Sequence, residues 1–246
     1  MPYLLRYSGT GGFDSSSASG FVSLSAFKLT LKAAFNGLPS ANYIIQARDN
    51  NDQGRFRIDS SGELQIRFGN QSIGISIPSS YFNNVAHTFV ITRNTSGTVN
   101  LSINGTFIGT DSNTQTGADS NRLGEHRGVY TETYDLYFYT GEDSDVGGSV
   151  IFDYQPASSG TVMPNTAGAD ASQVGTWPAD NSEWVLYSSG IEVTGATPNY
   201  NYAAIAGTVD LTGTITVTGA TPNYSYSAIA GAVDLTSTIT ITGDTP

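Results

Sequence analysis

Residues 85–110 read Val-Ala-His-Thr-Phe-Val-Ile-Thr-Arg (85–93), Asn-Thr-Ser-Gly (94–97), Thr-Val-Asn-Leu-Ser-Ile (98–103), Asn-Gly (104–105) and Thr-Phe-Ile-Gly-Thr (106–110). The Asn104-Gly105 pair predicts a β-hairpin, because a two-residue type I′ turn needs positive φ at both positions. The segment before it alternates apolar with polar residues, which predicts a strand with one buried face and one face in water. This stretch therefore predicts three short antiparallel strands.

The rest of the chain also reads as short strands joined by turns. Only 13% of the 246 residues are charged, and the chain holds 28 Gly and 14 Tyr. Helical apolar spacing does not extend beyond a few residues, whereas strand-like runs recur at residues 3–7, 21–35, 43–47, 55–59, 63–68, 73–77, 134–139 and 149–154. Many short strands separated by turns predict an all-β sandwich or barrel.

The central stretch resembles the laminin-G-like domains, which are concanavalin A-like jelly rolls. In that family a strand that carries a His and an Arg, here His87 and Arg93, leads into a hairpin with Asn-Gly or Asp-Gly at its tip. The run Leu-Arg-Tyr-Ser-Gly-Thr-Gly-Gly-Phe (5–13) looks like the first strand of the family, and Gln-Ala-Arg-Asp (46–49) with Phe-Arg-Ile (56–58) looks like its basic loop and the strand that follows. The resemblance spans residues 3–155. It implies a jelly-roll β-sandwich that binds glycans or other proteins, since only some members of this fold catalyse reactions.

Residues 156–188 fit the family pattern less well. The segment Trp-Pro-Ala-Asp-Asn-Ser-Glu-Trp (177–184) resembles a closing segment of such domains in phage and marine bacterial proteins. We therefore expect a laminin-G-like jelly-roll domain at residues 1–188 and a separate region at residues 189–246.

Residues 193–240 form a tandem repeat of 24 residues, in which Val193-Thr-Gly-Ala-Thr-Pro-Asn-Tyr200 recurs at residues 217–224. The two copies differ at four positions, and a third copy begins at Ile241. Each copy holds two strand-like pieces but too few apolar residues for a core, so it must stack on its neighbours or on other chains. We expect a β-rich shaft or assembly element and a homo-oligomer, for example a trimer. A small self-contained β-domain or a flexible linker is the alternative.

Charge is distributed unevenly between the two halves of the chain. Residues 1–127 hold 10 basic and 8 acidic residues, whereas residues 128–246 hold 13 acidic and no basic residues. A nucleic-acid partner is not expected, because it requires a basic groove. The acidic half favours solubility and repulsion between copies, with calcium binding as the sharper alternative.

The sequence also gives information on the location of the protein. The chain has no cysteine, which excludes disulfides and thiolate metal sites. No stretch approaches the roughly 20 apolar residues of a membrane span. The first residues lack the apolar core of a cleaved secretion signal. A protein released by cell lysis, such as a virion part, needs no signal, so we expect a virion-surface or extracellular location.

Catalytic patterns are weak, and we predict that the protein is not an enzyme. Glycoside hydrolases of this fold place paired carboxylates on one strand as Glu-x-Asp-x-(x)-Glu, with retaining carboxyl groups about 5 Å apart. The nearest match, Glu132-Thr-Tyr-Asp135, has the wrong spacing and lacks the second Glu. Only His87 and His126 could act as bases at neutral pH. His87 stands where the resembled family carries a strand His, which implies that this side chain is packed structurally.

Calcium is the one cofactor that the sequence suggests. This ion takes six to eight oxygen ligands from irregular loops, and members of the resembled family often hold it at one rim of the sandwich. Two loops supply such ligands, although their spacing matches no specific motif and ordinary polar loops are the alternative. The candidate calcium ligands are Asp49, Asn50, Asp52, Asp111, Asp119 and Asn121.

Glycan binding requires exposed aromatic rings near planar hydrogen-bonding groups. Strand alternation puts Tyr137 and Tyr139 on one face and Leu136 and Phe138 on the other, so part of this aromatic set is expected to be exposed. Sheet packing is the alternative for each Tyr, and Arg55, Arg57 and Arg67 are expected to form a solvated face rather than an acidic-glycan site. The candidate glycan-binding residues are Tyr130, Tyr134, Tyr137, Tyr139, Trp177 and Trp184.

These patterns favour a non-enzymatic surface or virion structural protein with a lectin-like domain for glycan binding or adhesion. A phage fibre or a capsid-surface component fits them best, and its partners would be cell-surface glycans or other virion subunits. Two alternatives stay open: an assembly subunit without glycan binding, and a bacterial adhesin or filament subunit.

Overall fold

The computed structural model describes residues 3–19, 24–47, 54–116, 120–157, 160–176 and 183–187, together with short strands between residues 192 and 242. The chain divides into two compact units. One unit is Leu5–Trp177, and the other combines Met1–Leu4 with Pro178–Pro246. The first contains most of the predicted jelly roll and the second contains the repeats.

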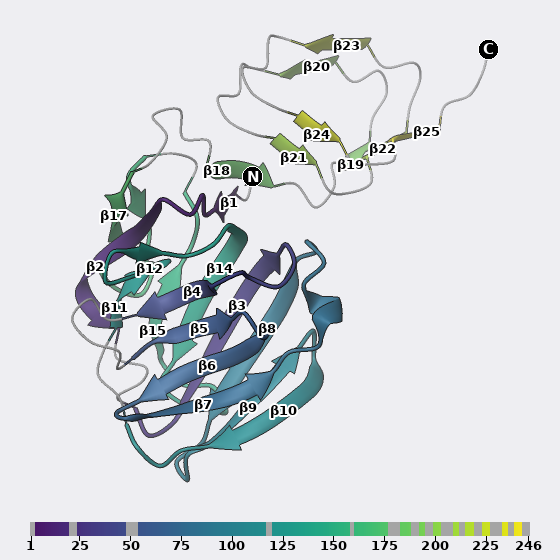
Figure 1. Cartoon of the computed structure of the whole chain (residues 1–246). Coiled ribbons are helices and arrows are strands. Elements are labelled where there is room, and N and C mark those ends of the chain that lie inside the picture. Colours follow the sequence, from purple (N-terminus) through teal and green to yellow (C-terminus); the bar gives the residue numbers. More distant parts are fainter. Residues whose placement is uncertain are drawn as a thin grey trace. The chain divides into compact units, whose positions relative to one another are not determined.

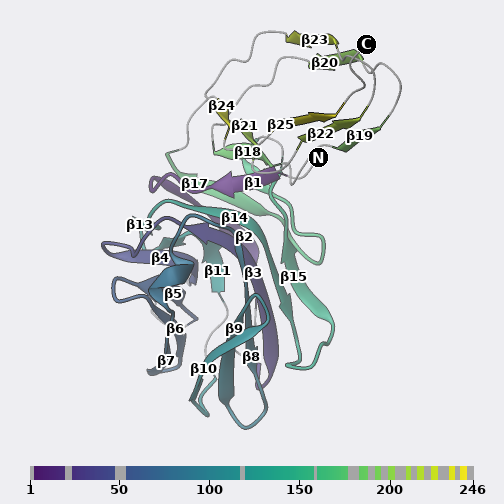
Figure 2. The same ribbon diagram turned by 90° about the vertical axis from the view of Figure 1, so that its right-hand side faces the viewer.

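Two antiparallel sheets form the unit Leu5–Trp177, and they lie as two layers in Figures 1 and 2. The first sheet has the order β10 (Thr106–Ser112), β9 (Thr98–Ile103), β8 (His87–Arg93), β3 (Phe27–Phe35), β14 (Tyr134–Glu142) and β1 (Tyr3–Arg6), and β15 (Val150–Tyr154) pairs with β14. The second sheet has the order β16 (Val162–Met163), β17 (Ala171–Gly175), β2 (Gly11–Ser19), β11 (Ser120–Leu123), β4 (Asn42–Ala47), β5 (Phe56–Asp59), β6 (Glu63–Phe68) and β7 (Gln71–Ser76). The predicted all-β, concanavalin A-like jelly-roll sandwich is confirmed.

Apolar residues at every second position create the core between the layers. In β6, β8 and β9 buried side chains alternate strictly with partly exposed ones. Ile91, Leu101 and Ile103 are fully buried, as are Phe13, Phe27 and Phe35. Aromatic rings pack closely in this core, because the Phe35 ring lies 4.7 Å from that of Tyr43 on the facing sheet and 5.2 Å from that of Tyr134 on the same sheet.

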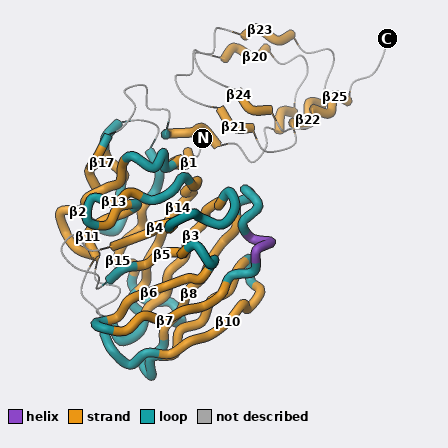
Figure 3. The backbone as a smooth tube through the Cα atoms, viewed as in Figure 1, coloured by secondary structure: helices purple, strands orange, loops and turns teal. Residues whose placement is uncertain are grey.

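The predicted hairpin is confirmed in detail. Asn104 and Gly105 have φ of 51° and 79°, and the flanking residues Ile103 and Thr106 are paired. The Asn104 side chain fixes the turn to β8, since its Oδ1 accepts the Thr88 N–H at 2.9 Å. A 3₁₀ turn, η2 (Ser79–Tyr81), is the one helical segment of the described residues, as Figure 3 shows. No helix in those residues is long and apolar enough to cross a membrane.

His87 is packed into the structure, as expected from the sequence. Its Nδ1 lies 2.9 Å from the Asn104 amide nitrogen and accepts its hydrogen, so Nε2 carries the proton and donates to Asn83 Oδ1 at 3.1 Å. The Tyr81 ring meets the imidazole edge-on with 5.1 Å between ring centres. This side chain therefore ties η2 and the Asn104 hairpin to the start of β8.

Burial of His87 predicts a pH dependence of stability. Burial lowers its pKa below the ordinary value of 6.5, because the imidazolium loses hydration. The unfolded chain then binds a proton at higher pH than the folded chain, so the free energy of unfolding should fall as the pH drops below about 6.5. Urea denaturation at pH values from about 7.5 to about 5 measures this decrease in the free energy of unfolding. The decrease should be absent in His87→Gln and should remain in the control variant His126→Gln. A wild-type stability that stays constant over this range would contradict the expectation. The carboxylates with lowered pKa, at Asp59, Glu132 and Asp153, lose their contribution only at more acidic pH.

The repeat strands of the second unit stack in parallel, each on its counterpart 24 residues along the chain. Asn199 pairs with Asn223, Val209 with Val233 and Ile215 with Ile239. The three sets are β18 (Trp184–Tyr187), β21 (Val209–Leu211) and β24 (Val233–Leu235); β19 (Glu192–Thr194), β22 (Ile215–Thr218) and β25 (Ile239–Thr242); and β20 (Asn199–Tyr202) with β23 (Asn223–Tyr226). In the described strands, successive repeats thus form coils of a parallel β-solenoid.

Candidate ligand-binding pocket

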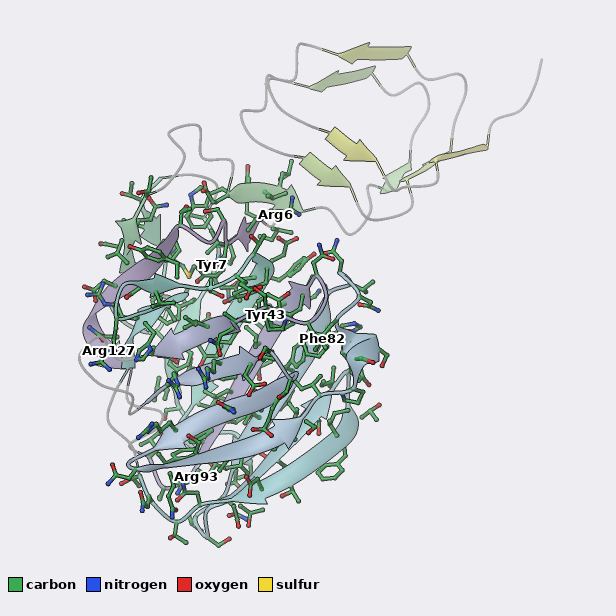
Figure 4. All side chains as sticks on the ribbon, in the orientation of Figure 1. Arg6, Tyr7, Tyr43, Phe82, Arg93 and Arg127 are labelled. Carbon is green, nitrogen blue, oxygen red and sulfur yellow. The ribbon has the colours of Figure 1, made fainter. Side chains whose placement is uncertain are left out.

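A pocket of about 400 Å³ opens in the jelly roll where three connections between strands meet. One connection follows β1, one joins β3 to β4, and one joins the small hairpin strand β13 (Val129–Tyr130) to β14. Figure 4 labels Tyr43, which lines the pocket, and Arg93, which lies toward the other end of the sandwich. The pocket is lined by Gly9, Asn36, Leu38, Tyr43, Tyr130, Thr131, Glu132 and Thr133.

Tyr130 provides the partly exposed aromatic ring of this pocket. It ends a hairpin between β12 (Glu125–His126) and β13, whose turn residues Arg127 and Gly128 have φ of 56° and 79°. Its phenol packs against Gly175 on β17, where an added Cβ would lie 2.6 Å from the Tyr130 oxygen. The glycine backbone therefore permits the close approach that holds the Tyr130 ring in place.

Glu132 is the acidic side chain in the wall. Its Oε2 accepts the Ser40 N–H at 3.0 Å, while its Oε1 accepts the Ser40 hydroxyl at 3.0 Å and the Ala41 N–H. Burial alone would raise the pKa of Glu132, but the hydrogen bonds from Ala41 and Ser40 outweigh it and lower the pKa below the ordinary value of 4.5. The carboxylate is therefore charged at neutral pH, and it fixes the β3–β4 connection against the β13–β14 connection.

Two further hydroxyl groups maintain the pocket wall. Thr131 is 1% exposed, and its Oγ1 accepts the Ile44 N–H at 2.9 Å and donates to the Glu132 carbonyl at 3.0 Å. The Tyr43 hydroxyl donates to the Gly37 carbonyl at 3.0 Å. The side chains of Asn36, Leu38 and Thr133 are exposed, so the open wall offers an amide, a hydroxyl and an apolar surface.

Two of the predicted glycan-binding tyrosines lie in the core. Tyr134 and Tyr139 are 2% and 1% exposed, and burial raises the pKa of both hydroxyls. Tyr134 stacks on Tyr7 with 4.8 Å between ring centres, whereas the Tyr139 hydroxyl donates to Gln46 at 2.8 Å. Both are candidate glycan-binding residues from the sequence, and their burial in the core corrects that expectation.

A β-bulge explains the error in the alternation. The register of β14 against β3 shifts between Leu136 and Phe138, so Tyr137 and Phe138 are both partly exposed while Tyr139 turns inward. Tyr137 therefore does not share a face with Tyr139. It lies beneath Lys32, whose amine is 5.3 Å from the ring centre.

Trp184 is not among the described residues that line the pocket. Trp184 is 2% exposed and belongs to β18 of the second unit. Trp177 lies outside the described residues. Of the six predicted glycan-binding residues, the pocket lining includes Tyr130.

The predicted calcium ligands do not gather in the described part of the chain. Asp111 on β10 accepts the Gly74 N–H at 2.8 Å and the Ser112 N–H at 2.7 Å, whereas Asn121 on β11 of the other sheet donates to Asp14 at 3.3 Å. Asp49, Asn50, Asp52 and Asp119 lie outside the described residues. Within the described ranges, no group of three or more His, Cys, Asp or Glu could hold a metal ion. The described ligands thus do not fit a calcium site, which needs six to eight oxygens.

The remaining charged candidates have structural contacts. Asp135 is 6% exposed and accepts two hydrogen bonds from Arg6, at 2.7 and 2.8 Å. On the outer face of the second sheet, Arg57 donates from Nε and Nη2 to Gln65 Oε1 at 3.0 and 2.8 Å. Glu132 and Asp135, the nearest match to a catalytic pair, thus each hold a neighbouring segment of backbone or side chain.

The pocket residues Asn36, Leu38 and Thr133 were missed by sequence reasoning. They meet because β3 and β14 pair with Phe35 opposite Tyr134, which brings the residues just beyond these two positions together. Nearly a hundred residues separate the two segments, and local patterns contain no signal for such a pairing.

No family model matches the sequence, and no curated protein does. A candidate carbohydrate-binding protein from Bacteroides ovatus ATCC 8483 has a similar structure, with a TM-score of 0.55 and 12% identity. The match covers 71% of this chain, which spans 58% of the length of that protein. The heptameric SAP-like pentraxin of Limulus polyphemus has a TM-score of 0.45 and 11% identity, covering 58% of this chain and 77% of that one. Domains LG4-5 of the mouse laminin alpha1 chain have a TM-score of 0.41 and 14% identity, covering 57% and 40%. At these identities the similarity to the Bacteroides protein concerns the fold.

Proposed function

We propose that the jelly roll is a non-enzymatic, lectin-like domain that binds glycans in the pocket at Tyr130. The observation that carries this proposal is the composition of the pocket, whose lining combines the partly exposed Tyr130 ring with the exposed residues Asn36 and Thr133. Sugars bind through the apolar faces of their rings and through hydroxyl groups that need fixed polar partners. The volume of about 400 Å³ is within the usual range for small-ligand pockets. The fold similarity to the candidate carbohydrate-binding protein of Bacteroides supports the same class of function.

A matched pair of variants tests the location of the site. We expect Tyr130→Leu to weaken glycan binding by about tenfold or more, because the ring supplies the stacking surface. Tyr137→Leu removes an equally large, partly exposed ring from the outer face of the first sheet and should leave binding unchanged. Glycan-array screening of the intact chain identifies the sugar, and calorimetry then compares the variants.

The outcomes separate the alternatives. Loss of binding in Tyr137→Leu but not in Tyr130→Leu would move the site to the outer sheet face. If the folded chain binds no glycan, the glycan-binding proposal is wrong, and the alternative of a domain that contacts only other proteins is favoured. The array is run with calcium and with a chelator, and loss of signal with the chelator would place calcium in or beneath the site.

The stacked repeats support a place on an elongated surface structure. Each 24-residue repeat adds one coil whose strands pair in register with the last, which suits a shaft or an assembly element. In this proposal the chain belongs to a virion-surface structure such as a phage fibre or capsid-surface component, and it assembles as a homo-oligomer. A bacterial adhesin or filament subunit is the second candidate. Light scattering of the purified chain tests the assembly state.

A further inference from the structure

One acidic side chain lies among the described lining residues of the pocket. This residue, Glu132, is the one charged side chain among the described lining residues. The hydrogen bonds from Ser40 and Ala41 keep the carboxylate ionised at neutral pH. A ligand in the pocket therefore meets a fixed negative charge.

The two arginines nearest to the pocket lining along the sequence are Arg6 and Arg127. Arg6, on β1, makes a two-fold hydrogen bond to the carboxylate of Asp135, so that pair is balanced within itself. Arg127 is outside the pocket lining, and Figure 4 places it at the edge of the molecule, away from Tyr43. Among the described lining residues, the formal charge of the pocket wall is therefore that of Glu132.

The Glu132 carboxylate can accept hydrogen bonds at about four positions. Its Oε2 accepts the Ser40 N–H, its Oε1 accepts the Ser40 hydroxyl and the Ala41 N–H, and a backbone hydrogen bond from Asn42 also contributes to its lowered pKa. A sugar hydroxyl can donate to such a group in a charge-assisted hydrogen bond, which is stronger than a neutral one. A carboxylate or sulfate on the ligand has no proton to donate and repels Glu132.

We infer that the pocket binds uncharged, hydroxyl-rich sugars and rejects sialylated, uronic or sulfated ones, with Glu132 as the specificity-determining residue. This inference rests on the proposed glycan binding. Two unit charges a few ångströms apart near a protein surface repel enough to lower affinity by about tenfold or more. The discrimination should weaken at high salt, because counter-ions screen the repulsion.

The test uses a glycan array that displays each neutral oligosaccharide beside its sialylated and sulfated forms. We expect the intact chain to bind neutral glycans and to bind the anionic form of each at least about tenfold more weakly. Calorimetry at low and high salt should show constant affinity for the neutral sugar and a gain for the anionic form. In Glu132→Gln, the difference in affinity between the neutral and the anionic form of the same glycan should become smaller. Glu142→Gln makes the same charge change at the far end of β14, and this variant should keep the wild-type difference in affinity between neutral and anionic glycans.

Each outcome bears on one claim. Equal or tighter binding of the anionic forms by the wild-type chain would overturn the inference and leave glycan binding intact. A difference that persists unchanged in folded Glu132→Gln would remove Glu132 from this role. If Glu132→Gln fails to fold, the salt series on the wild-type chain tests the electrostatic repulsion instead. An affinity for the anionic form that does not rise with salt would then overturn the inference. Absence of all glycan binding would overturn the proposed function, and the inference with it.

Discussion

Replacement of Arg93 by methionine should lower the free energy of unfolding by about 3–5 kcal/mol. Arg93 ends β8 and is 2% exposed. Its Nη1 donates to the carbonyls of Leu24 and Ser25, at 2.7 and 3.0 Å. Its Nη2 donates to those of Asn113 and Gln115, at 2.8 and 2.9 Å. Methionine has a similar length but donates no hydrogen bond, so the carbonyls of two separate segments would lose this partner.

The guanidinium also stacks over the Phe68 ring, with 4.8 Å from its central carbon to the ring centre. This contact connects the two sheets, since β8 and β6 belong to different layers. Arg93→Lys keeps the charge, but a lysine ammonium cannot donate to all four carbonyls as the planar guanidinium does. We therefore expect a loss in the free energy of unfolding that is smaller than that of Arg93→Met. Urea denaturation followed by near-ultraviolet circular dichroism of the buried tyrosines measures both variants.

Arg57→Met is the matched control. Arg57 is only partly buried, and its contacts run to Gln65 on the neighbouring strand, so the loss should stay below about 1 kcal/mol. A destabilisation by Arg93→Met no larger than that of Arg57→Met would contradict the role of Arg93 as a buried tie between the layers.

The second large effect is expected for Gly124→Ala, at about 2–4 kcal/mol of lost stability. Gly124 has φ of +67°, and a Cβ at this position would lie 2.2 Å from the Tyr7 ring. That ring is fully buried and stacked on Tyr134, so it has little room to move. The residue thus lets the β11–β12 segment pass directly over the core.

Gly128→Ala separates the steric cost from the backbone cost. Gly128 has φ of +79°, with nothing within 4 Å of an added Cβ. It should lose only the about 1–2 kcal/mol that a left-handed conformation costs. Equal losses in the free energy of unfolding for Gly124→Ala and Gly128→Ala would show that the Tyr7 ring can move to accommodate the added methyl group. A double variant Tyr7→Leu/Gly124→Ala should lose less than the sum of its single changes, because the clash is shared.

Local patterns predicted the strands well because burial alternates along them. The alternation in residues 98–103 and the Asn104-Gly105 turn both appear in the structure, since each depends on neighbours within a few positions. The packing of His87, which the family resemblance implied, is also observed.

The candidate site was less predictable, since it depends on long-range register. A bulge in β14 turned Tyr139 inward and left Tyr137 outside, although simple alternation places them together. Tyr130 could be named from its aromatic character alone. Asn36 and Thr133 join it only because Phe35 pairs with Tyr134.

The most direct test of the glycan-binding proposal is a crystal structure of the intact chain with the tightest-binding array sugar. We expect the sugar ring against Tyr130, with hydroxyl groups within hydrogen-bond distance of Glu132 and of Asn36 or Thr133. A sugar bound on another face of the jelly roll, or on the repeats, would contradict the assignment of the pocket as the binding site.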